Sequence, residues 1–225
     1  MNEEEKRRIK ENLETIFNAV EGKNVTVVAA TKTVDAERIN YAIECGLRHI
    51  GENRVNELLE KYDSYDKRAE VHFIGQLQRN KVKYIIDKVS LIHSVDSVAL
   101  ADEIEKQAKK HGLVMDVLIE VNIGREESKG GVMPEELDKV LEYIRTLDHV
   151  KVRGLMAIPP KIENVENKSN FFSKMSEIFI DISTQNVDNS SMDILSMGMS
   201  ADYVEAVNCG STMIRPGTAI FGKRF

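Results

Sequence analysis

The sequence predicts an α/β protein whose strands form a single (β/α)8 TIM barrel with an extra N-terminal helix. Two observations predict this class. Eight short runs of β-branched and apolar residues alternate with stretches whose apolar residues recur with helical spacing, as in parallel strands joined by helices. The chain has 225 residues, a length that one such barrel fits. A doubly wound open sheet is the alternative that the same pattern leaves open.

The predicted elements follow one another in the order that repeated βαβ units require. A leading amphipathic helix places Ile9, Leu13, Ile16, Phe17 and Val20 on one face. The predicted strands are Val25–Ala30, His49–Gly51, Val71–Gly75, Leu91–Val95, Met115–Ile123, Val152–Ile158, Asp193–Met197 and Thr212–Ile214. The predicted helices between them are Glu37–Cys45, Arg54–Tyr62, Lys81–Lys88, Val98–Lys110, Pro134–Leu147 and Asn170–Ser183. Three polar stretches are predicted as loops: Gly124–Gly131, Lys161–Ser169 and Thr184–Ser191.

Composition and charge narrow the class of partner. The formal net charge is −6, which argues against nucleic acid or an anionic membrane as the main partner. No stretch approaches the 18 consecutive apolar residues of a membrane span, and the charged N-terminus lacks the apolar segment of a signal peptide. Two widely separated cysteines make no disulfide framework. We therefore expect a cytoplasmic protein that binds neither nucleic acid nor membrane.

A lysine follows the first predicted strand, at the end where parallel barrels carry their functional residues. Lys32 comes directly after a nearly continuous apolar run, so we expect its amine to be partly desolvated and therefore neutral. A neutral lysine amine can form a Schiff base with an aldehyde. The alternative is a structural lysine whose ammonium group reaches solvent from a strand end.

Small and hydroxyl-bearing residues follow the last two predicted strands. They are Ser196, Gly198 and Ser200 after the seventh, and Gly217 and Thr218 after the eighth. Loops at these places often hold a phosphate group in barrels. Tight turns, with Ser200 as the N-cap of a helix from Ala201, would explain the same residues without a ligand. A lysine nucleophile together with such loops indicates a phosphorylated carbonyl compound as the ligand.

Seven segments form a recognisable series along nearly the whole chain. They are Ala29–Thr33, Gly51–Asn53, His72–Gln78, Arg153–Ile158, Leu195–Ser200, Gly210–Arg215 and Gly217–Gly222. In this order they resemble the pyridoxal 5′-phosphate (PLP) homeostasis proteins, a family related to the N-terminal barrel of alanine racemase. The resemblance implies one PLP-binding barrel domain over residues 1–225, with PLP as the cofactor.

The resemblance also assigns roles within a cofactor site. It assigns Lys32 to a Schiff base with PLP, Asn53 to a place beside the ring, Ser196 and Met199 to the pocket lining, Ser200, Gly217 and Thr218 to the phosphate, and Arg215 to the pyridine nitrogen. Two positions depart from the usual pattern. Thr31 stands where many members carry serine, and Pro216, which has no N–H to donate to a phosphate, replaces an aliphatic residue.

Arg215 bears on the chemistry that such a site could perform. A carboxylate partner keeps the pyridine nitrogen of PLP protonated and makes the ring a strong electron sink. A guanidinium group cannot accept that proton, so the bound ring would be a weaker electron sink. A salt bridge with Glu52 or Asp202 is the alternative role for this arginine.

The resemblance implies a carrier or regulator in intracellular PLP (vitamin B6) homeostasis rather than a catalyst. Alanine racemase takes a second base, a tyrosine, from an additional domain of a partner subunit, whereas the sequence here stops at Phe225, soon after the last predicted strand. Tyr203 could be proposed as a substitute, although helix packing is its commoner role. The alternatives are a PLP-dependent, racemase-like enzyme and a Schiff-base aldolase acting on sugar phosphates. PLP-dependent apo-enzymes are the expected recipients, and we expect a monomer.

The histidines predict no metal site. None of them shows the spacing of metal ligands on one element; the five are His49, His72, His93, His111 and His149. We interpret His72, near the start of a strand, as a structural histidine.

Overall fold

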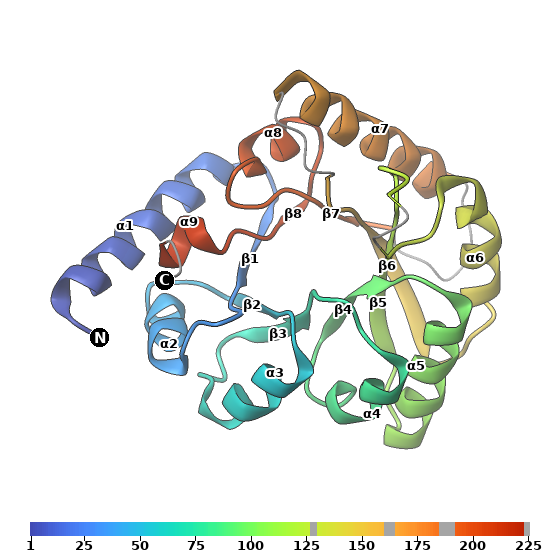
Figure 1. Ribbon diagram of the computed structural model, residues 1–225, viewed down its shortest axis with the longest axis horizontal. Coiled ribbons are helices and arrows are strands. Elements are labelled where there is room, and N and C mark those ends of the chain that lie inside the picture. Colours follow the sequence, from blue (N-terminus) through green and yellow to red (C-terminus); the bar gives the residue numbers. More distant parts are fainter. Residues whose placement is uncertain (127–129, 160–164, 185–191, 223–225) are drawn as a thin grey trace.

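Eight parallel strands close into a barrel in the order of the chain. The computed structural model describes residues 1–126, 130–159, 165–184 and 192–222, and in this part of the chain β1 to β8 pair in sequence order, with β8 returning to β1. Helices lie on the outside of the strands (Figure 1). The predicted α/β barrel is therefore confirmed, and the open sheet is not the architecture.

The strands lie within three residues of their predicted bounds. They are β1 (Thr26–Ala30), β2 (His49–Glu52), β3 (Glu70–Phe73), β4 (Leu91–Val95), β5 (Met115–Glu120), β6 (Val150–Met156), β7 (Ile194–Ser196) and β8 (Met213–Ile214). The short β7 and β8 complete the closure, because Val27 of β1 pairs with Ile214 and Ser196 pairs with Met213. The register of β2 on β3 places His49 opposite Glu70.

The helices follow the predicted alternation with differences at their ends. They are α1 (Glu3–Val20), α2 (Ala36–Glu44), α3 (Val55–Lys61), α4 (Val82–Ile85), α5 (Val98–His111), α6 (Leu137–Ile144), α7 (Val165–Thr184), α8 (Tyr203–Asn208) and α9 (Thr218–Phe221), with 3-10 turns η1 (Tyr62–Ser64), η2 (Arg79–Lys81) and η3 (Pro134–Glu136). The predicted loop at Lys161–Ser169 is wrong from Val165 onward, where α7 has already begun. Of the other predicted loops, residues 127–129 and 185–191 lie outside the described residues, as do 160–164.

The leading helix is longer than its apolar pattern alone predicts. It begins at Glu3 because Asn2 and Glu5 form a reciprocal capping box, in which the Asn2 side chain accepts from the Glu5 amide. Ile9, Leu13 and Ile16 are buried, as the pattern predicts. The helix lies beside α9 (Figure 1), and the Asn12 side chain donates to the Ile220 carbonyl oxygen at 2.9 Å.

The core has an outer and an inner part. The outer part fills the space between strands and helices. The inner part is a small apolar cluster of Val28, Ile74, Leu91, Leu118, Met156 and Met213. Buried polar side chains accompany it, among them His72, His93, Ser196 and Arg215. Among the described helices, none combines the length and the apolar character that crossing a bilayer requires.

Candidate functional site

Lys32 follows the carboxyl end of β1, whose last residues contact β2 on one side and the segment after β8 on the other. The Ala30 amide donates to the Pro216 carbonyl oxygen at 2.8 Å, and the Thr31 amide donates to that of Gly51 at 3.0 Å. The Lys32 side chain is exposed, so the expected desolvation is wrong. The reason is that β1 ends at Ala30 and the chain turns at Lys32 and Thr33, which carries the lysine beyond the buried part of the strand.

A buried ion pair holds the segment that carries Lys32. Lys61, at the end of α3, places its Nζ 2.6 Å from Oε1 of the fully buried Glu52. The same ammonium group donates to the carbonyl oxygens of Thr31 and Val34, both at 3.1 Å. Glu52 Oε1 also accepts from the hydroxyls of Thr31 and Tyr65, each at 2.7 Å. Burial, and then the neighbouring Glu52, raise the pKa of Tyr65, so this hydroxyl stays a donor.

Backbone strain occurs next to Lys32. Thr33 has φ +61°, in the left-handed region that β-branched residues rarely adopt, and its amide donates to the Glu57 carboxylate at 2.7 Å. Contacts from α3 therefore fix both sides of Lys32, through Glu57 and through Lys61. Strain of this kind is typical of segments whose shape serves a function.

Replacing Thr33 by glycine is expected to raise the free energy of unfolding by about 1 kcal/mol, because glycine adopts the left-handed region without the side-chain clash. Chemical denaturation of both proteins measures the difference. Asn24→Gly is the matched control: Asn24 has φ +47°, but asparagine tolerates this region, so a smaller gain is expected. Equal gains at the two positions would contradict a specific strain at Thr33.

Ser200 joins the two loops that the sequence assigns to a phosphate. Its Oγ accepts from the amides of Gly217 and Ala219, at 2.9 and 3.0 Å. Ser200 is not a helix N-cap, because α8 begins at Tyr203 after Asp202. Thr218 begins α9 with an exposed side chain, and Met199 is 36% exposed beside the loop. Two backbone N–H groups therefore converge on one hydroxyl oxygen, which takes the place that a phosphate oxygen could take as their acceptor.

Arg215 is buried at the end of β8. Its guanidinium donates to Ser196 Oγ and, at 3.0 Å, to the Ala157 carbonyl oxygen. The alternative salt bridge with Glu52 is wrong, because Lys61 occupies that carboxylate. Asp202 lies 3.8 Å from Lys168 and acts on Arg215 only by longer-range attraction. Burial lowers the pKa of Arg215 to about 10, which leaves the group positively charged at neutral pH.

Asn53 follows β2, and the carbonyl oxygen of its side chain, Oδ1, is buried. Among the described residues, no hydrogen-bond partner reaches its Oδ1. A Cβ at position 75 would lie 2.2 Å from the Asn53 backbone oxygen, so glycine is required there for β3 to approach this segment. A buried polar atom without a partner is costly unless a ligand or water satisfies it.

A row of three histidine rings, joined by hydrogen bonds, extends from Ser196 into the barrel. His93 Nδ1 lies 3.2 Å from Ser196 Oγ, and His93 Nε2 lies 2.9 Å from His72 Nδ1. His72 Nε2 lies 3.2 Å from His49 Nδ1. Burial lowers the pKa of His72 to about 3 and that of His93 well below its usual value, so both rings are neutral. The structural interpretation of His72 thus extends to His93, which connects it to the partner of Arg215.

The contacts tie most predicted site residues to one end of the barrel. They link Ser200 to Gly217 directly and Ser196 to Arg215 directly. The Ala30 amide links the Lys32 segment to Pro216, which lies between Arg215 and Gly217 in the chain, and the Thr31 amide links it to β2. Sequence reasoning missed Lys61 and His93. Lys61 resembles any lysine at a helix end, but His93 interrupts an apolar strand, and a polar residue in such a run was the available signal.

Comparisons with known proteins match almost the whole chain. The family model for the alanine racemase N-terminal domain matches residues 5–224. A protein named pyridoxal phosphate homeostasis protein from Aquifex aeolicus is 48% identical over 223 residues, with 96% of this chain and 97% of that protein covered. The structure of PipY from Synechococcus elongatus with PLP bound is 32% identical at a TM-score of 0.86, covering 95% of this chain and all of that one.

More distant structures share the fold alone. An alanine racemase from Clostridium difficile is 16% identical at a TM-score of 0.74, over 97% of this chain and 57% of that one. Family model, relative and structure agree over the full barrel and in its order of elements. On that evidence the chain belongs to the pyridoxal phosphate homeostasis proteins, a family with the alanine racemase N-terminal domain fold.

Proposed function

We propose that this protein binds PLP reversibly, through a Schiff base with the Lys32 amine, and acts as a carrier in PLP homeostasis rather than as a catalyst. The observation that carries the proposal is the convergence of the Ser200 hydroxyl and the Gly217 and Ala219 amides beside the end of β1 that leads to Lys32. The PLP bound to PipY and the names of the relatives support the choice of ligand.

The residues at this end of the barrel fit a phosphorylated pyridine aldehyde. Ser200, Gly217 and Thr218 would hold the phosphate, with backbone N–H groups as donors. The unpartnered Oδ1 of Asn53 would accept a hydrogen bond beside the ring, and Met199 and Ser196 would line the pocket. Lys32, exposed before the ligand binds, would be accessible to the aldehyde.

Arg215 supports the carrier over the enzyme. PLP supplies an electron sink for carbanions, and a carboxylate beside its pyridine nitrogen strengthens that sink. Arg215 instead presents a buried guanidinium whose orientation Ser196 and Ala157 fix, and a guanidinium accepts no hydrogen bond. Such a partner leaves the ring nitrogen unprotonated. The site would therefore bind PLP without activating substrates strongly.

Replacing Lys32 by alanine is expected to abolish the visible absorbance that PLP gives when it forms a Schiff base with the wild-type chain, because the variant lacks the amine that forms the bond. Absorbance titration with PLP measures this. Lys23→Ala is the control: Lys23 is an exposed lysine before the opposite end of β1 and should leave the absorbance unchanged. If the wild-type chain stays colourless with added PLP, the proposal is refuted.

The carrier role is tested separately from binding. PLP-loaded protein is expected to activate an apo-form of a PLP-dependent enzyme, as measured by that enzyme's activity. It should also show no racemisation or transamination of a panel of amino acids. Turnover on the order of 1 per second or faster would favour the racemase-like alternative.

A further inference from the structure

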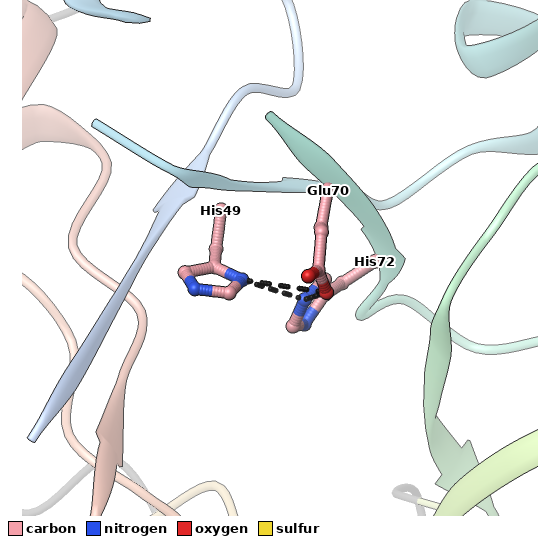
Figure 2. Close-up of side chains that lie close together, drawn as sticks. All are labelled: His49, Glu70 and His72. Atoms are coloured by element: carbon pink, nitrogen blue, oxygen red, sulfur yellow. Dashed lines mark hydrogen bonds and ion pairs between the residues drawn. The ribbon is translucent and has the colours of Figure 1, made fainter. Parts of the chain in front are cut away.

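Three side chains meet at the amino-terminal end of the barrel, the end opposite Lys32. His49 is the first residue of β2 and Glu70 is the first residue of β3, and the two are partners in the strand register. His72 follows two positions later on β3 and is buried. Figure 2 shows the two rings and the carboxylate pointing toward one another. The cluster is separate from the proposed cofactor site.

The spacing of the three side chains matches a small coordination sphere. His49 Nδ1 and His72 Nε2 are 3.2 Å apart, and Glu70 Oε2 lies 3.8 and 4.0 Å from them. Two ligand atoms on a tetrahedral zinc ion, with bonds of about 2.05 Å, lie roughly 3.3 Å apart. The imidazole pair already has this spacing. The Glu70 side chain is 63% exposed, so it is free to make the small movement that remains.

Both rings are prepared to act as ligands. Burial lowers the pKa values of His49 and His72, so both rings are neutral at pH 7 and each carries a lone pair on one nitrogen. The hydrogen shared between His49 Nδ1 and His72 Nε2 would move to the far nitrogen of its ring when a cation binds. The other nitrogen of His72, Nδ1, lies 2.9 Å from His93 Nε2. Metal-bound histidines usually donate their second N–H to such a partner, which fixes the ring and its tautomer.

We propose that His49 Nδ1, His72 Nε2 and a Glu70 carboxylate oxygen bind a divalent zinc-class cation, with water in the remaining position. Two imidazole nitrogens and one carboxylate suit Zn²⁺ and its first-row neighbours, whereas Mg²⁺ and Ca²⁺ prefer oxygen ligands alone. The sequence shows no ligand spacing because the two histidines come from different strands.

A bound cation would also fix the tautomers in the row of histidine rings that leads to Arg215. With its Nε2 on the metal, His72 carries its hydrogen on Nδ1 and donates to His93 Nε2. His93 must then carry its hydrogen on Nδ1 and donate to Ser196 Oγ, which also accepts from Arg215. A cation bound at one end of the barrel would therefore fix the tautomer of His93, near the other end.

The test uses the full chain after removal of metals by a chelator. Calorimetric titration is expected to show one Zn²⁺ per chain and no binding of Mg²⁺. Co²⁺ should give a visible spectrum without a thiolate charge-transfer band; that band would place the metal on a cysteine and overturn the proposal. Nitrogen NMR should show the His93 hydrogen on Nδ1 when Zn²⁺ is bound.

Two variants at accessible positions locate the site. His49→Gln and Glu70→Gln are each expected to weaken Zn²⁺ binding by roughly tenfold or more. The matched control is His149→Gln, which breaks the other His–Glu pair, His149 with Glu105 at 2.9 Å, and should leave the affinity unchanged. Unchanged affinity in the first two variants, or an equal loss in the control, would overturn the proposal. Neither result bears on PLP binding.

Discussion

Replacing Lys61 by methionine is expected to lower the free energy of unfolding by about 3–5 kcal/mol, the cost of leaving one member of a buried ion pair without its partner. Glu52 is fully buried, and the Lys61 side chain is only 15% exposed. Methionine keeps the length of the apolar stem but removes the ammonium group. The carbonyl oxygens of Thr31 and Val34 also lose the hydrogen bonds from this ammonium group, although the Thr31 oxygen keeps the one from the Val34 amide. Urea denaturation of variant and wild type measures the loss.

Two further variants separate the ion pair from a general effect of losing a lysine. Lys10→Met removes a surface lysine that lies 4.0 Å from Glu14, and a loss within about 0.5 kcal/mol is expected there. Glu52→Gln combined with Lys61→Met should be more stable than Lys61→Met alone, because a neutral amide oxygen still accepts from Thr31 and Tyr65. Similar losses for Lys61→Met and Lys10→Met would refute the buried pair as a source of stability.

Acidification from pH 7 to pH 5 is expected to destabilise the fold by about 2 kcal/mol through His72, and His93 adds to the loss in the same direction. Burial lowers the pKa of both rings in the folded state, to about 3 for His72, whereas an unfolded histidine titrates near pH 6.5. The unfolded chain therefore binds more protons below pH 6.5. The stability that the neutral rings provide is complete above that pH and falls as the pH drops toward the folded pKa values, by about 2 kcal/mol at pH 5 for His72.

Urea denaturation at several pH values in metal-free buffer measures the slope. Proton NMR assigns it: the ring signals of His72 and His93 should stay fixed between pH 7 and pH 5 in the folded protein and should titrate in urea. Movement of either signal near pH 6.5 in the folded protein would show that the ring is solvated and would remove its share of the effect.

The spacing of the apolar residues predicted the barrel well, because burial dictates that spacing. Strands buried on both faces read as apolar runs, and the helices between them read as one-sided patterns, so eight alternations were visible in the sequence. Element ends were less predictable. The polar letters before Asn170 indicated a loop, yet α7 begins at Val165, because a surface helix also tolerates polar residues.

The candidate site was predictable in its residue types and less so in its environment. The order of the segments pointed to Lys32, Ser200 and Gly217, and the structure joins Ser200 to Gly217. The exposure of Lys32 depends on where β1 ends, which an apolar run does not mark. The buried ion pair of Lys61 could not be predicted from the sequence, because its partner Glu52 lies on a different element. Only the packing of α3 on β2 brings the two together.

The pairing of β1 with β8 has a consequence for synthesis on the ribosome. The first strand, β1, emerges early, but the edge that pairs with β8 has no partner until β8 has been made. In the same way, α1 has no contact with α9 until the end of the chain has been made. Contacts between such distant parts of a chain slow folding, because the intervening loop must close first. Lys32 and Gly217 both lie at the carboxyl end of this late seam, one after each of the two parallel strands. The end of the barrel that carries the candidate site is thus among the last parts to assemble, and a nascent chain would present Lys32 without the loops that complete the candidate site.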